Sequence, residues 1–276
     1  NGTSSLYKEF PDRCFDVGIA EANMVGVAAG LAAYGYKPIV VTFAPFATRR
    51  VCDQIAVSVA YAKQNVKIVG TDPGITAELN GGTHMSFEDI ATLRSIPTMT
   101  IYDAVDDTQV YQAIKQIMNT DGPCYIRMPR KTAQPVYDEN YKFALNKADV
   151  ITKGNDITIV ASGIMVAESL KAVLKLKEEG ISAELISANT IKPLDEETIL
   201  NSIKKTNHVV TCENHNVIGG LYSAVSEMLI EKYPLHVDKI AVMDQFGQVG
   251  KYSELLNYYH LTSNDIYNVV KKNLNK

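Results

Sequence analysis

Hydrophobic residues form short continuous runs that alternate along the chain with longer segments of helical periodicity. The runs lie at 38–43, 66–71, 98–103, 124–129, 156–162, 181–187, 208–213 and 236–243. Near-continuous apolar runs of four to eight residues are typical of strands that are buried on both faces. The pattern therefore predicts eight buried strands.

Helices are predicted between these strands. They lie at 19–34, 47–63, 87–94, 106–119, 164–179, 195–205, 219–232 and 262–274. This alternation predicts parallel sheets with helices on both faces. Residues 131–149 are polar, contain proline and lack periodicity, as linkers do.

We therefore predict an α/β protein with two doubly wound domains. The first domain covers 1–135, the linker 136–149 and the second domain 150–276. The polar segment before residue 15 contains no strand pattern. Because such domains usually open on a strand, we expect the first strand of the first domain to lie outside this sequence.

Composition excludes several classes of partner. The chain has 276 residues and a net charge of -4, which gives no basic surface for nucleic acid or anionic membranes. No apolar run reaches the roughly 18 residues that span a bilayer. The four cysteines are far apart and form no C-x-x-C pair, which favours free thiols in a reducing compartment. We expect a cytoplasmic protein that binds neither nucleic acid nor membranes.

Glu21 is the only charged residue from Ile19 to Tyr36, in the segment "GIAEANMVGVAAGLAAYG". It opens a helix made of glycine, alanine and aliphatic residues. Two interpretations stay open. An acid in the first turn complements the helix dipole, whereas a carboxylate in such an apolar setting can also share a proton with a ligand.

Two loops follow predicted strands and carry candidate ligand-binding side chains. "TFAPFATRR" places Phe43, Phe46 and Arg49 after one strand, and "NGGTHM" places His84 after the next. Open α/β sheets bind ligands at the carboxyl ends of their strands. The alternative is that both phenylalanines belong to the hydrophobic core and that the histidine has no role in ligand binding.

A third strand ends in "YIRMPRK", with Arg127, Arg130 and Lys131. Three cations at a strand end predict an anion clamp. Solvated surface charge is the alternative. The sequence contains neither a Walker motif nor a G-x-G-x-x-G motif, and no metal ligands are expected in this chain.

These segments together resemble the C-terminal half of transketolase, in the split form where two chains make one enzyme. The matching segments are "FDVGIAEANMVGVAAGLAAYG", "VTFAPFATRR", "GTHMSFEDIATLRSIP", "GPCYIRMPR", "ANTIKPLDEETI", "VVTCENHNVIGGLYSAVSE" and "DQFGQVG". The resemblance implies a thiamine pyrimidine-binding domain followed by a transketolase C-terminal-like domain. The β subunits of 2-oxoacid dehydrogenases and the deoxyxylulose-phosphate synthases share much of this pattern.

The resemblance also implies roles for individual residues. Glu21 matches the glutamate that bonds N1′ of the aminopyrimidine of thiamine diphosphate and so promotes loss of the thiazolium C2 proton. Phe43 and Phe46 match residues that stack on that pyrimidine, and Arg49 stands where related enzymes carry a further aromatic. His84 matches a histidine that handles protons of substrate hydroxyls. Arg130 matches a phosphate-binding arginine.

Two positions depart from the family pattern. Asn80 stands where an acid usually reads a donor hydroxyl, and Asp72 stands where a histidine is usual. Both belong to the substrate-contacting set rather than the cofactor-contacting set. We expect an altered ketose donor, with a branched, a modified and a sulfonated sugar all open.

The family's metal–diphosphate motif is absent from the sequence. The resemblance therefore implies a partner, the N-terminal transketolase subunit, which would hold Mg²⁺ and the diphosphate in an α2β2 assembly. The expected function is transfer of a two-carbon ketol unit from an anionic ketose to an aldose. A 2-oxoacid dehydrogenase β subunit and a non-catalytic assembly subunit stay as alternatives.

Overall fold

The computed structural model describes residues 3–131 and 133–275. The first half is built from helices and strands whose bounds are α1 Ser4–Glu9, α2 Glu21–Ala33, β1 Ile39–Phe43, α3 Ala44–Ala47, η1 Arg49–Val51, α4 Cys52–Gln54, η2 Ile55–Tyr61, β2 Lys67–Thr71, η3 Gly74–Asn80, α5 Asp89–Arg94, β3 Thr100–Asp103, α6 Asp107–Asn119 and β4 Cys124–Met128. Here η1 and η3 are 3-10 helices and η2 is a π-helix.

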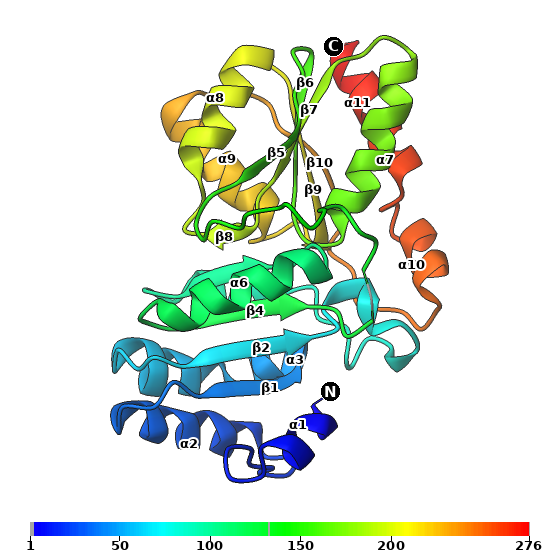
Figure 1. The fold of residues 1–276 in the computed structure, drawn as a ribbon. Coiled ribbons are helices and arrows are strands. Elements are labelled where there is room, and N and C mark those ends of the chain that lie inside the picture. The colour runs from blue at the N-terminus through cyan, green and yellow to red at the C-terminus, as the bar shows by residue number, and fades with distance from the viewer. Residues whose placement is uncertain (1–2, 132, 276) are drawn as a thin grey trace.

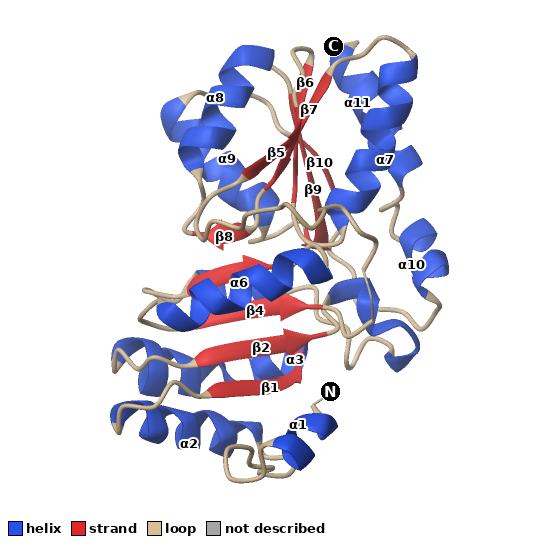
Figure 2. Ribbon diagram, in the orientation of Figure 1, coloured by secondary structure: helices blue, strands red, loops and turns tan. Residues whose placement is uncertain are grey.

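The second half has its own sheet and helices (Figures 1 and 2). Their bounds are β5 Asp149–Thr152, β6 Ile157–Ala161, α7 Met165–Glu178, β7 Ala183–Ser187, β8 Thr190–Lys192, α8 Glu196–Thr206, β9 Val209–Asn216, α9 Leu221–Lys232, β10 Asp238–Val242, α10 Tyr252–Tyr258 and α11 Ser263–Leu274. All eight predicted strands are present, and their ends lie at most three residues from the predicted ends.

The sheets confirm the predicted doubly wound α/β class. The first sheet has the order β1-β2-β4-β3-β8 and the second β10-β9-β6-β7-β5. Every pair is parallel except β3–β8 and β5–β7. The sequence pattern missed β5 and β8, because edge strands this short have no continuous apolar run.

Strand β8 joins the two domains. It follows β7 in the second half of the chain, yet it pairs antiparallel with β3 of the first sheet, with Tyr102 opposite Thr190. In Figure 1 it lies directly above the first sheet, at the lower rim of the second domain. The first domain therefore completes its sheet with a strand of the second.

The predicted single helix at 47–63 is confirmed only in part. Residues 49–61 are helical, but they form three adjoining pieces, η1, α4 and η2, and Thr48 is not helical. Thr48 leaves helical geometry, with φ -130° and ψ -86°, and its hydroxyl bonds the Ala44 carbonyl oxygen at 2.7 Å. This break turns Arg49 and Arg50 outward at the carboxyl end of β1. The hydrophobic periodicity of the sequence gives no indication of the break at Thr48.

Helix α2 lies at the outer edge of the first domain, beyond β1 (Figure 1). Only four of its residues are buried, namely Glu21, Val25, Ala28 and Ala29. A Cβ added at Gly26 or Gly30 would meet nothing within 4 Å, and Val27 is exposed. The helix has an all-round apolar composition, but this chain covers only one of its faces.

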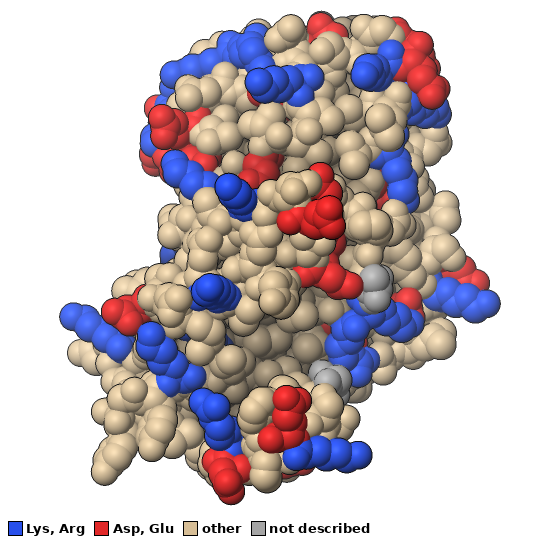
Figure 3. Space-filling model, viewed as in Figure 1, with Lys and Arg blue, Asp and Glu red and all other residues tan. Residues whose placement is uncertain are grey.

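The surface of the face seen in Figure 3 carries acidic and basic side chains side by side, without a large area of one sign. Among the described residues, no helix is both long and apolar enough to cross a bilayer. The four cysteines are free thiols, and burial raises the pKa of both Cys124 and Cys212 to about 12.

Candidate active site

The predicted site residues gather where three parallel strands end. Phe43, Thr71 and Met128 stand in register at the carboxyl ends of β1, β2 and β4. The chain segments that follow carry Phe46, Asp72 and Arg130. Parallel pairing therefore brings residues far apart in the sequence to one edge of the sheet, as expected for an α/β ligand site.

An aromatic cluster forms the centre of this edge. The rings of Phe43 and Phe46 lie 6.1 Å apart, edge to face. The His84 ring lies 5.2 Å from Phe43 and 5.0 Å from Phe46, again edge to face. All three are half-buried. The structure thus brings the histidine loop against the aromatic segment, as the sequence predicted.

Glu21 joins this cluster through Arg50. The guanidinium of Arg50 lies 3.8 Å from the centre of the Phe46 ring and donates to Glu21 Oε2 at 3.0 Å. The Glu21 side chain is 10% exposed. Its Oε1 has no hydrogen-bond partner among the described residues. A flat cationic group thus stacks on a phenylalanine while it bonds the glutamate.

Arg49, one residue earlier, turns toward the histidine loop. Its Nη1 donates to Glu88 Oε1 at 2.7 Å and its Nη2 to the Thr83 carbonyl oxygen at 3.2 Å. Thr83 in turn shares a hydrogen bond of 2.9 Å with His84 Nδ1. Arg49 therefore ties the aromatic segment to the loop that carries the histidine.

Asp72 and Arg130 form an ion pair at the other end of the cluster. Asp72 accepts from the Arg130 backbone N–H at 2.9 Å, and its second oxygen accepts from Arg130 Nε. The Arg130 guanidinium also lies 4.7 Å from the centre of the Phe43 ring. The adjacent Lys131 pairs with Glu78.

Asn80 lies apart from these contacts. Its amide donates to the Ala77 carbonyl oxygen at 2.7 Å within its own turn, and the residue is exposed. The polar contacts of Asn80 are thus local, unlike those of Asp72.

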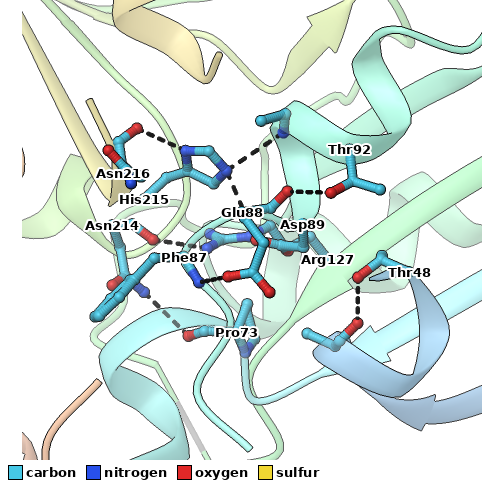
Figure 4. Close-up of polar contacts among 12 residues, drawn as sticks. Thr48, Pro73, Phe87, Glu88, Asp89, Thr92, Arg127, Asn214, His215 and Asn216 are labelled. Atoms are coloured by element: carbon cyan, nitrogen blue, oxygen red, sulfur yellow. Dashed lines mark hydrogen bonds and ion pairs between the residues drawn. The ribbon is translucent and has the colours of Figure 1, made fainter. Parts of the chain in front are cut away.

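Arg127 is not part of an anion clamp, and that expectation is wrong. Its side chain is 1% exposed. It donates to Asp89 at 2.7 Å and to Asp103 at 3.2 Å. It also donates to the Asn214 carbonyl oxygen at 2.6 Å (Figure 4). Successive side chains of a strand point to opposite faces, and Arg127, inside β4, points inward. Arg130 lies three residues later, beyond the carboxyl end of β4. We call this edge, where β1, β2 and β4 end, the rim of the site.

This buried cluster links the two domains. Burial alone would raise the pKa of Asp89, but Arg127 outweighs it and holds that pKa below its ordinary value. Burial raises the pKa of Asp103, which also accepts from the Ser162 hydroxyl at 2.8 Å. Asp89 Oδ1 has no hydrogen-bond partner and lies 3.9 Å from His215 Nε2.

Asn214 of β9 holds the loop that leads from Asp72 toward His84. Its Oδ1 accepts from the Ile75 N–H at 3.0 Å, and its Nδ2 donates to the Pro73 carbonyl oxygen at 3.1 Å (Figure 4). Gly74 has φ +55°, and a Cβ there would lie 2.2 Å from Asn214 Oδ1. Sequence reasoning missed this residue, because no local pattern marks a contact across 139 positions.

His215 and Glu213 lie beside Asn214 on the same strand. Burial lowers the pKa of His215 to about 4 and raises the pKa of Glu213 to about 7. His215 Nδ1 lies 2.7 Å from the Asn216 carbonyl oxygen, while Nε2 accepts from the Ala91 N–H at 3.3 Å, so neutral imidazole with a proton on Nδ1 fits both contacts.

Comparison with known families covers nearly the whole chain. The model of the transketolase pyrimidine binding domain matches residues 1–135, and that of the transketolase C-terminal domain matches residues 146–266. A solved structure described as a split gene transketolase, inactive beta4 tetramer, superposes with a TM-score of 0.90 at 40% identity, covering 99% of this chain and 88% of that one.

Curated relatives agree with these models. The 6-deoxy-6-sulfo-D-fructose transketolase subunit SqwH of Clostridium sp. (strain MSTE9) is 52% identical and covers 94% of this chain and 80% of its own length. An apulose-4-phosphate transketolase subunit of Phocaeicola vulgatus is 36% identical over 94% of this chain and 83% of its own. The transketolase of Mus musculus is 34% identical over 97% of this chain but only 43% of its own length.

Asn214→Ala should destabilise the protein by about 2–4 kcal/mol, because it leaves the Ile75 N–H and the Pro73 carbonyl oxygen buried without partners. Urea unfolding followed by circular dichroism measures the change. Asn264→Ala is the control, since Asn264 is an exposed asparagine that accepts only from Lys175 at 3.1 Å. Equal stability of the two variants would contradict the role given to Asn214.

His215 and Glu213 should oppose each other in the pH dependence of stability. The contribution of His215 is full above its ordinary pKa of 6.5 and is lost as the pH falls toward about 4. The contribution of Glu213 is full below its ordinary 4.5 and is lost as the pH rises through about 7. Removing either group should therefore change the slope by up to about 1.4 kcal/mol per pH unit between these limits.

Urea unfolding at about pH 5 and about pH 6.5 measures this slope. Relative to wild type, the free energy of unfolding of His215→Asn should fall as the pH rises, and that of Glu213→Gln should rise. His236→Asn is the control, because His236 is an exposed histidine bonded to Asp238 at 3.2 Å. Slopes like that of the control in both variants would show that neither group titrates as described.

Proposed function

Because this chain belongs to the transketolase family, we propose that it is the C-terminal subunit of a two-chain transketolase that depends on thiamine diphosphate. The reaction transfers a two-carbon ketol unit from a ketose to an aldose. One observation carries the proposal: Glu21, Phe46 and His84 form a continuous chain of contacts at the strand ends, with Arg50 as the link.

Arg50 supports the fit of an aminopyrimidine. Its guanidinium is planar, carries N–H groups, stacks on Phe46 and donates to Glu21. An aminopyrimidine is also planar and offers nitrogen atoms at its edge, so it can replace the guanidinium on the same ring and the same carboxylate. When bound, thiamine diphosphate supplies the carbon nucleophile that breaks the C–C bond of the donor.

The residues of this chain have separate tasks in that proposal. Glu21 holds a proton at N1′ of the pyrimidine from a nearly buried position, where a hydrogen bond is stronger than in water. Phe43 and Phe46 hold the ring plane, and Arg49 fixes the histidine loop against them through Thr83. His84, between both phenylalanines, exchanges protons with substrate hydroxyls.

The donor is proposed to be an anionic ketose that carries a sulfonate. The 52% identical relative is described as a 6-deoxy-6-sulfo-D-fructose transketolase subunit, which supports this choice over a branched sugar. Arg130 would hold the anionic end, beside Asp72. Asn80 would accept a hydrogen bond from a donor hydroxyl through Oδ1, because its bond to Ala77 uses only the amide nitrogen.

The uncovered face of α2 supports the proposal that a partner subunit binds this chain. Gly26, Val27 and Gly30 lie open on the helix that begins with Glu21. This chain also matches only 43% of the length of the mouse transketolase. We propose that an N-terminal subunit supplies the remainder, with the site that binds the diphosphate and Mg²⁺, in an α2β2 assembly. Location in the cytoplasm stays a prediction.

Glu21→Gln should lower kcat of the assembled enzyme by about 10²–10⁴-fold, because the amide cannot carry the shared proton. The assay is ketol transfer from 6-deoxy-6-sulfo-D-fructose to an aldose acceptor. Glu227→Gln is the matched control, since Glu227 also pairs with an arginine but lies far from the aromatic cluster. Near-normal turnover of Glu21→Gln would leave Glu21 with only its helix-dipole role.

The isolated chain should bind thiamine diphosphate and Mg²⁺ too weakly to detect at micromolar concentration, because it provides only the pyrimidine side of the site. Calorimetric titration with and without the co-purified partner subunit tests this. Tight binding and turnover by this chain alone would contradict the two-chain proposal.

A further inference from the structure

We propose that Asp72 makes this site select a singly charged anionic end of the donor, a sulfonate, over a doubly charged one, a phosphate ester. The inference rests on the proposed function, because it assumes that the donor's anionic end reaches Arg130. It goes beyond that function by assigning the choice between two anions to one carboxylate of this chain.

Asp72 is fixed in place by its backbone and its neighbours. The residue directly follows β2 and is 3% exposed. Its φ of +52° lies in the left-handed region, where Asp and Asn are more easily accommodated than most residues. Its N–H donates to the Met128 carbonyl oxygen at 3.0 Å, and one side-chain oxygen accepts from the Arg130 N–H at 2.9 Å. The carboxylate cannot swing away when a ligand arrives.

The same carboxylate already neutralises part of the Arg130 charge. Its second oxygen accepts from Arg130 Nε, which leaves Nη1 and Nη2 as the nitrogens without a hydrogen-bond partner among the described residues. The Arg130 side chain is 35% exposed, so part of it is open to a ligand. Arg130 can therefore still hold two oxygens of an anion, but with little net positive charge behind them.

Two other cations near Arg130 are balanced in the same way. Arg49 pairs with Glu88 and Lys131 with Glu78. Arg50 is not part of this set, because the proposed pyrimidine takes its place on Glu21 and its ring contact is with Phe46, whereas Arg130 lies over Phe43. Neither Arg49 nor Lys131 is therefore left unpaired to compensate a second negative charge on the ligand.

The two anions differ in charge rather than shape. A sulfonate has three oxygens and one negative charge throughout the physiological pH range. A phosphate ester also has three terminal oxygens, but it loses a second proton with a pKa of about 6, so it is mostly doubly charged at neutral pH. Beside the fixed Asp72 carboxylate, the second charge is repelled without gaining a new hydrogen bond.

The test compares two donors that share a skeleton, 6-deoxy-6-sulfo-D-fructose and fructose 6-phosphate, on the enzyme assembled with its partner. Both kcat and KM are measured between about pH 5 and about pH 8, on either side of the phosphate pKa. The ratio of kcat/KM for the two donors cancels those titrations of the protein that affect both donors equally, because both donors meet the same enzyme.

In wild type the ratio should favour the sulfonate and should rise with pH as the phosphate gains its second charge. In Asp72→Asn the ratio should drop by about tenfold or more near pH 8, through a lower KM for fructose 6-phosphate with little change in kcat. The amide keeps the left-handed backbone and one acceptor for the Arg130 N–H, and the melting temperature verifies that the variant is folded.

Glu227→Gln is the control, because it also removes one carboxylate beside an arginine, Arg94, which is not among the rim cations. It should leave the ratio as in wild type. An equal drop in Glu227→Gln would show that overall charge decides, and an unchanged ratio in Asp72→Asn would show that Asp72 does not; either result overturns the inference.

Calorimetric titration of the two donors gives the same ranking without turnover. Absence of ketol transfer with both donors would reject the proposed function, whereas the binding ratio still decides on Asp72. Ketol transfer with a preference for fructose 6-phosphate near neutral pH would leave the function standing and reject the inference.

Discussion

The buried guanidinium of Arg127 is the interaction on which the rest of this structure depends. It lies where β4, β3 and α5 of the first domain meet β9 of the second, and it bonds residues of both domains. A buried ion pair adds little net stability, because desolvation offsets much of the attraction. Its effect is geometric: both domains are bonded to one rigid planar group, so β9 cannot shift without leaving a buried N–H of the guanidinium without its acceptor.

The contacts of Arg127 form the junction between the two domains, and this junction also determines where the loop that leads to His84 lies. Asn214 lies on β9, its carbonyl oxygen is the one that Arg127 bonds, and its side chain holds Pro73 and Ile75 in place. That loop begins at Asp72 and leads to His84. The second domain, which contributes no residue to the aromatic cluster, therefore fixes the position of the histidine and of the Asp72 carboxylate through one asparagine side chain.

Charge is arranged differently at the junction and at the rim. At the junction one cation serves two carboxylates, and all three groups are out of contact with water. At the rim each cation has one carboxylate and most are partly exposed, so a ligand can exchange one partner for another at modest cost. The first arrangement fixes the two domains relative to one another, and the second leaves the cations partly exposed to solvent.

The pattern of residues along the chain was enough to predict two α/β domains, their eight principal strands and several residues that gather at the rim. Apolar runs report burial on both faces, and parallel strands bring their carboxyl ends to one edge, so Phe43, His84 and Arg130 could be grouped before any contact was known. The quoted motifs identified the family, which the comparisons confirmed.

Features that depend on pairing between distant segments became visible only in the folded chain. It placed β8 in the sheet of the other domain, broke the helix at Thr48, and separated the buried Arg127 from the accessible Arg130. It also paired Asp72 with Arg130. Each outcome is set by contacts between segments remote in sequence, and local periodicity contains no information about which distant side chain will meet a given charge.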